Sequence, residues 1–120
     1  MTAEEKVRAV ALSLPRSHEA LVRGRIKFRV GSIVYLAFSR DETLMGFAFP
    51  KEYRQALIDS EPDKFLMPPL SDQRFHWVVG RVAAIGDEEL RHIVIDAWAM
   101  CVPKFLSAPY RADDAGARMA

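Results

Sequence analysis

The chain has a single cysteine, Cys101, so no intramolecular disulfide can form. One free thiol is typical of a reducing compartment. No segment approaches the roughly 20 consecutive apolar residues that a membrane span requires. The acidic start at residues 1–5 lacks the basic and apolar segments of an export signal. We therefore expect a cytoplasmic protein that makes no contact with a membrane.

Short motifs of common catalytic and cofactor sites are also lacking. There is no His-Glu-x-x-His or paired-cysteine pattern, and the scattered glycines form neither a P-loop nor a dinucleotide fingerprint. His92 and Asp96, four residues apart, fit ordinary pairing on a helix surface. Cys101 falls on the apolar face of the same predicted helix and fits an inert thiol. We expect no enzyme activity, no metal and no cofactor.

An excess of charge of one sign is absent as well, because 17 basic and 16 acidic residues leave a net charge of +1. The position of the charges is therefore more informative than their sum. Half of the 120 residues are apolar or aromatic, enough for one core and too little for two. We predict a single domain over residues 1–106. The small and charged residues 107–120 are predicted to form a flexible C-terminal tail.

Helical periodicity predicts three helices. Thr2 and Glu5 have the spacing of a capping box, and the helix that follows them ends at Pro15. The other two helices are predicted over residues 50–59 and 87–102. In the second helix we expect the core to be contacted by Tyr53, Ala56 and Leu57.

Runs of alternating or apolar residues between polar turns predict the strands 22–30, 33–38, 43–49 and 74–82, with a short edge strand at 64–67. Together with the helices they give the order α-β-β-β-α-β-β-α. Strand runs without regular βαβ alternation predict an α+β fold, a two-layer sandwich in which an antiparallel sheet of about five strands has its helices on one face.

The strand at 22–30 is the most informative segment. It alternates apolar residues with Arg23, Arg25, Lys27 and Arg29, so all four cations are predicted to lie on one face. At a spacing of about 6.7 Å, neighbouring cations repel by roughly 0.6 kcal/mol in water. We find no acidic residue in any predicted strand, whereas the acids gather in helix ends and turns. The pattern favours a basic sheet surface.

Two interpretations of this surface remain open. It can bind the phosphates of DNA or another polyanion through Arg23, Arg25, Lys27 and Arg29, assisted by Arg81 and Lys51, with low sequence selectivity. Alternatively, the cations protect an edge strand against aggregation.

Aromatic residues in the predicted sheet add candidates for stacking on bases. We consider Trp77, His76 and Tyr35. Because Trp77 and His76 are adjacent in a predicted strand, they are expected to point to opposite faces, so that at most one shares the basic surface. Aromatic residues in strands also belong commonly to a core.

The order of several short motifs resembles the MmcQ/YjbR family of small bacterial proteins, over about residues 7–106. The motifs are Leu12-Ser13-Leu14-Pro15, Lys27-Phe28-Arg29-Val30-Gly31, Val34-Tyr35-Leu36-Ala37-Phe38, Phe49-Pro50-Lys51-Glu52, His76-Trp77-Val78, Asp87-Glu88-Glu89-Leu90 and Val102-Pro103-Lys104. The resemblance implies one α+β domain like that of type III secretion chaperones, and a DNA-binding function.

The leading hypothesis is therefore a non-enzymatic domain that binds nucleic acid on its sheet. The alternative is a chaperone-like interaction module that binds a peptide or a helix on the same sheet. We expect a monomer. A dimer is the other possibility, because Tyr53, Ile95, Trp98, Met100 and the apolar strands 33–38 and 43–49 offer more apolar surface than one sheet face buries.

Overall fold

The structure is a computed structural model that describes residues 1–110. Its elements are α1 (Ala3–Ala11), β1 (Ser17–Val22), β2 (Arg25–Val30), β3 (Ile33–Phe38), β4 (Leu44–Ala48), α2 (Lys51–Ser60), β5 (Phe65–Leu66), η1 (Leu70–Asp72), β6 (Trp77–Arg81), η2 (Val82–Ala84) and α3 (Asp87–Ala99). Residues 104–110 are also helical.

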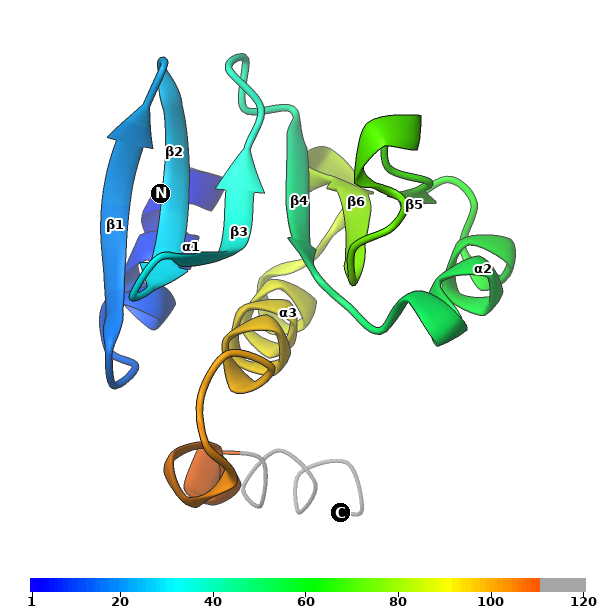
Figure 1. Ribbon diagram of the computed structural model, residues 1–120. Coiled ribbons are helices and arrows are strands. Elements are labelled where there is room, and N and C mark those ends of the chain that lie inside the picture. Colours follow the sequence, from blue (N-terminus) through cyan, green and yellow to red (C-terminus); the bar gives the residue numbers. More distant parts are fainter. Residues whose placement is uncertain (111–120) are drawn as a thin grey trace.

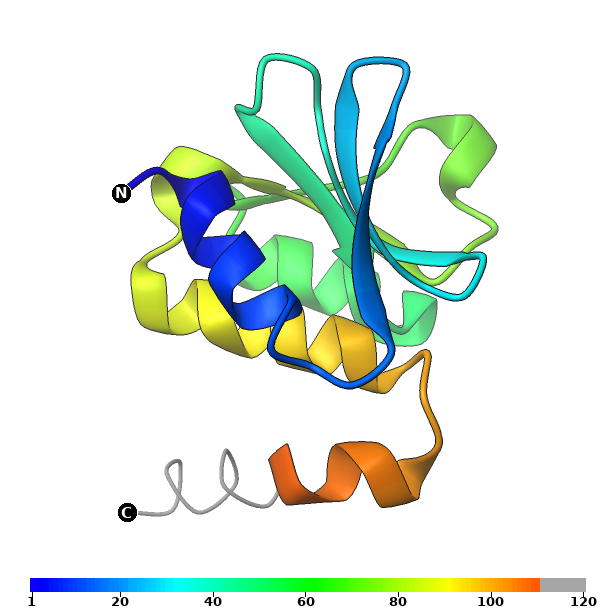
Figure 2. The ribbon, with the colours of Figure 1, turned by 90° about the vertical axis from the view of Figure 1, so that its left-hand side faces the viewer.

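All six strands form one antiparallel sheet in the order β1-β2-β3-β4-β6-β5 (Figure 1). A side view places α1 and α3 on one side of the sheet and η1 on the other (Figure 2). The α+β class and the antiparallel sheet are confirmed. No helix among residues 1–110 has the length and apolar character that crossing a membrane requires.

The sixth strand is β1, which the sequence analysis did not predict. It forms a hairpin with β2 in which Val22 pairs with Arg25. The two residues between them, Arg23 and Gly24, have φ angles of 53° and 78°. Positive φ at both central positions defines the tight turn that suits the twist of a hairpin. The prediction of one continuous strand through residues 22–30 is therefore wrong at its start.

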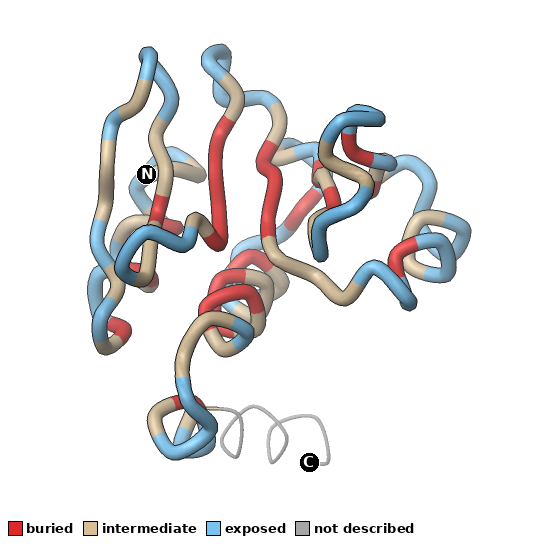
Figure 3. The backbone as a smooth tube through the Cα atoms, in the orientation of Figure 1, coloured by how far each residue is buried: buried red, intermediate tan, exposed pale blue. Residues whose placement is uncertain are grey.

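The helix-facing side of the sheet carries the core. Register places Phe28 beside Leu36, Leu36 beside Phe47, and Phe47 beside Val78, and all four are buried. Val7 of α1 and Val94 of α3 pack against them. Burial is concentrated in the central strands and in α3 (Figure 3). The helix-facing side therefore supplies most of the apolar burial that drives folding.

Trp98 contacts residues near both ends of the described chain. Its side chain is fully buried in α3, and its Nε1 donates a hydrogen bond to the carbonyl of Pro15, 2.9 Å away. Tyr110 packs edge-on against the same indole, with ring centroids 5.1 Å apart. Residues 107–110, assigned above to a C-terminal tail, thus lie in the last helical segment. Residues 111–120 of that predicted tail lie outside the described residues.

Hydrogen bonding and charge fasten α1 to β1. Thr2 caps α1 by accepting from the Glu5 amide, as predicted. Arg8 donates two hydrogen bonds to the Glu19 carboxylate, at 2.6 and 3.0 Å. The expectation that strands carry no acid is therefore wrong at Glu19. Because Glu19 projects toward α1, its charge is compensated on the helix-facing side of the sheet.

The ion pair predicts a pH dependence of stability. Hydrogen bonds from Arg8 hold the pKa of Glu19 below its usual value of 4.5. A lowered folded-state pKa gives stability that is present above that value and is lost as pH falls through the folded pKa. Because the pair is partly exposed, its contribution is about 0.5–1 kcal/mol. Glu19→Gln should lose that amount at pH 7 and almost nothing at pH 3.

Urea unfolding at the two pH values measures this difference. Asp63→Asn, at an exposed position, is the matched control and should follow the wild type at both pH values. A Glu19→Gln variant that follows the wild type at pH 7 would contradict the role of the pair.

Candidate functional site

A groove opens on the side of the sheet away from α1 and α3. Strands β3 and β4 pair only from Leu36 to Phe38, so the start of β3 separates from the end of β4. The gap has a volume of about 500 Å³. It is lined by Arg25, Lys27, Ile33, Val34, Ala37, Ala48, Asp72, Phe75, His76, Trp77, Met100 and Cys101.

Cations of β2 form the first wall of the groove. Arg25 and Lys27 line the groove from the face opposite the buried Phe28. Arg29 follows a shift in register, pairs with Val34 and is not among the lining residues. Arg25 is held over β3 by a 3.0 Å hydrogen bond from its Nε to the Phe38 carbonyl. Within residues 1–110 none of the three cations forms an ion pair with a carboxylate. The positive charge of this wall is therefore uncompensated.

Arg29 of β2 has an unsatisfied donor. Its Nε is shielded from solvent and has no hydrogen-bond partner among the described residues. An unsatisfied buried donor typically costs about 1–3 kcal/mol. The Nε of Arg29 therefore adds no hydrogen bond to the described fold.

The segment before and at the start of β6 forms the second wall. Phe75 is 51% exposed although it is a large apolar residue. The Arg74 guanidinium lies 4.7 Å from the centre of its ring. Trp77 lies directly on β4, because a Cβ added at Gly46 would come within 2.5 Å of the indole Nε1. A glycine inside a strand here permits the close approach of a ring.

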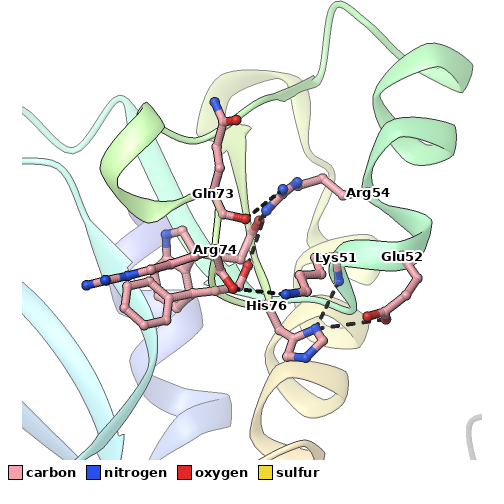
Figure 4. A network of polar contacts seen from close by, with 8 residues as sticks. Lys51, Glu52, Arg54, Gln73, Arg74 and His76 are labelled. Carbon is pink, nitrogen blue, oxygen red and sulfur yellow. Dashed lines mark hydrogen bonds and ion pairs between the residues drawn. The ribbon is translucent and has the colours of Figure 1, made fainter.

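Arg54 of α2 holds this wall in place. The residue is only 8% exposed, and its guanidinium donates to the carbonyls of Gln73 at 2.9 Å, Phe75 at 3.2 Å and Trp77 at 3.0 Å (Figure 4). Gln73 and Phe75 precede β6, and Trp77 is its first residue. One side chain thereby fixes the backbone that carries the rings of Phe75 and Trp77.

The N-terminus of α2 fixes His76. The backbone N–H of Lys51 donates to His76 Nδ1 at 3.0 Å, and the ammonium of Lys51 donates to the Arg74 carbonyl at 3.2 Å (Figure 4). Since Nδ1 accepts, the neutral ring carries its proton on Nε2. Lys51, predicted from the sequence as a phosphate ligand, therefore lies beside the aromatic wall rather than beside the cations of β2.

Small residues form the floor between the walls. Register aligns Lys27 with Ala37 and Ala37 with Gly46, while Ala48 lies opposite Trp77. From β2 to β6 there are three strand spacings, or roughly 14 Å. Ile33 and Val34 at the start of β3 and the Trp77 indole over Gly46 bound the space that remains between the walls.

Three other predicted site residues lie elsewhere. Arg23 is in the hairpin turn, where its carbonyl accepts from Arg40 Nε. Arg81 donates to the carbonyls of Pro62 and Asp63, away from the groove. Tyr35 is fully buried and bonded to Ser17 at 2.6 Å, and burial raises its pKa to about 12. Stacking of a base on Tyr35 is therefore wrong.

The expected opposition of His76 and Trp77 is also wrong, because both line the groove. His76 precedes β6, so strand alternation does not govern its direction. Sequence reasoning missed Asp72 and Phe75 in the same wall. It placed Tyr53 and Ala56 of α2 in the core, but both are exposed and the buried residue is Arg54.

One end of the groove is lined by Met100 and Cys101, which directly follow α3, and Cys101 contributes a partly buried thiol. Burial raises the pKa of that thiol, which keeps it protonated and weakly nucleophilic. No group of three or more potential metal ligands occurs in the part of the chain that the structure describes.

The fold and groove define a small α+β domain with a basic, aromatic-lined sheet surface. The YjbR family model matches residues 12–100, so the chain belongs to the YjbR family. The crystal structure of the Deinococcus radiodurans protein DR2400, a DUF419 domain, is similar at a TM-score of 0.70 and 18% identity, over 81% of this chain and 76% of that one. At this identity the likeness shows the fold. No curated protein matches the sequence.

The position of Arg54 predicts a large loss of stability when its donors are removed. Arg54→Met keeps much of the apolar stem but leaves three partly buried carbonyls without this donor. We expect the free energy of unfolding to fall by about 2–4 kcal/mol. Arg91→Met, at an exposed arginine on α3, should change it by less than about 0.5 kcal/mol. Urea unfolding measures both, and equal losses in the two variants would contradict the assigned role of Arg54.

Proposed function

We propose that the protein binds single-stranded nucleic acid in this groove, without catalysing a reaction. Arg25, Lys27 and Arg29 contact backbone phosphates, and an unstacked base lies against the aromatic wall. The observation that carries the proposal is that Arg25 and Lys27, which form no ion pair among the described residues, line one groove with the exposed rings of Phe75 and His76. Family membership is consistent with it but does not specify it.

The position of β2 argues against the protective interpretation of the cations. That interpretation needs an edge strand, because cations there discourage pairing with another chain. In the structure β1 covers the edge and β2 is an interior strand. The three cations therefore have no edge to protect, and a bound anion accounts for them better.

The dimensions of the site favour a single strand over a duplex. Three alternate residues of a strand span only about 13 Å. The groove, at about 500 Å³, is in the size range of a small-molecule site. A duplex keeps both faces of its bases stacked, whereas a single strand offers a bare base face to an aromatic ring.

One observation favours a second candidate, the binding of a peptide. Ile33, Phe75 and Met100 line the groove and are 55%, 51% and 42% exposed. An apolar side chain of a partner can also occupy such a surface. Binding of that kind is driven by apolar burial and is therefore insensitive to salt.

Salt dependence separates the two candidates. Three phosphate contacts to a single strand predict that affinity falls about 20-fold between 50 and 200 mM salt. In the double variant Arg25→Gln, Lys27→Gln one contact remains, so the fall should shrink to about threefold. Affinity at 50 mM salt should drop by at least about tenfold. Fluorescence anisotropy with a labelled hexathymidylate measures these values.

The matched control is Arg16→Gln, Arg91→Gln, which removes the same charge at exposed positions that do not line the groove. It should bind as the wild type does. Equal losses in both double variants would show attraction by net charge alone and would overturn the proposed surface.

A further inference from the structure

We propose that the groove selects a guanine base, an inference that rests on the proposed binding of single-stranded nucleic acid. The two walls differ in hydrogen-bonding character, and guanine is the base whose edges match both. The shared chemistry is a guanine nucleotide, whether it is one unit of a strand or a free nucleotide.

The first wall consists of donors. Arg25 and Lys27 come from β2, and the bond from Arg25 Nε to the Phe38 carbonyl leaves its two terminal nitrogens available. Arginine and lysine pair most often with the O6 and N7 acceptors of guanine. Adenine presents an amino group in place of O6, so it would turn a donor toward these cations.

The second wall contains one acceptor. Asp72 is the acidic residue among those that line the groove, and no hydrogen bond or ion pair engages its carboxylate within the described residues. The N1–H and the 2-amino group of guanine are adjacent donors, which match the two oxygens of a carboxylate. Thymine and cytosine present neither the O6 and N7 pair of acceptors nor the 2-amino donor of guanine.

The floor and the aromatic wall suit a purine between these groups. The Trp77 indole covers Gly46, and Ala37 and Ala48 are the small residues that line the groove beside it. The groove has a volume of about 500 Å³, in the size range of a small-molecule site, and so accommodates one purine. Rings that stack contribute affinity without regard to base identity, so the selectivity must come from the two polar walls.

The test uses hexathymidylates that carry one guanosine, inosine, 7-deazaguanosine or adenosine at the third position. Inosine lacks only the 2-amino group, and 7-deazaguanosine lacks only the N7 acceptor. We expect the guanosine strand to bind about tenfold more tightly than the other three, as measured by competition anisotropy.

Asp72→Ala supplies the matched change in the protein. It should abolish the preference for guanosine over inosine while leaving the preference for guanosine over 7-deazaguanosine, because that preference depends on Arg25 and Lys27. Affinity for plain hexathymidylate should not fall, since the variant removes a negative charge from the groove. A fall in affinity for every strand would indicate a structural role and would overturn the assignment of Asp72.

The outcomes separate this inference from the function on which it rests. Equal affinity of the wild type for all four substituted strands would overturn guanine selection and leave single-strand binding intact. No salt-sensitive binding of any strand would overturn the proposed function itself. Titration with free dGMP identifies the source: weaker binding than the guanosine strand supports a strand unit, whereas equal binding supports the guanine site as one for a free nucleotide and overturns the strand.

Discussion

The groove depends on the hydrogen bonds that the Arg54 guanidinium donates to its second wall. Without this guanidinium, the carbonyls of Gln73, Phe75 and Trp77 would lose the donor that they share. Three charge-assisted hydrogen bonds fix that backbone, and with it the positions of Phe75 and Trp77. The same arginine gives α2 its one buried side chain. A polar interaction therefore attaches α2 to the sheet and builds the aromatic wall, together with the packing of Leu57 and Ile58 against the core.

The two faces of the sheet carry different kinds of side chain. On the helix side Phe28, Leu36 and Phe47 fill the space under α1 and α3, and burial is complete. On the other side the same strands carry Lys27, Ala37 and Gly46, so charge stands at the margin and small residues at the centre. Strand alternation makes this division possible, since one strand can serve the core and the groove without conflict.

Sequence reasoning reached the elements that local patterns specify. The apolar runs of β3 and β4, the cap at Thr2 and the apolar face of α3 all have short-range signals. It failed where distant contacts decide. Arg23 continues a basic alternation, yet a turn places it outside the strand with a positive φ. Arg54 occupies the buried position because it donates to carbonyls about 20 residues away. The residues near Arg54 in the sequence give no signal of these contacts. Gly46 was the one available signal for the groove, since a glycine between strand residues marks a close approach.

The cations of β2 reduce the stability of the fold, which indicates that they serve another role. Arg25, Lys27 and Arg29 repel one another along β2, and the Nε of Arg29 is shielded without a partner. Glu19 shows that the fold can compensate an arginine where stability requires it, because it binds Arg8 through two hydrogen bonds one layer away. The fold pairs Arg8 with a carboxylate on its helix side and leaves Arg25 and Lys27 without one beside the groove. A stabilising role would predict the reverse arrangement. The uncompensated row is therefore better explained by an anion that binds from outside than by any need of the folded chain.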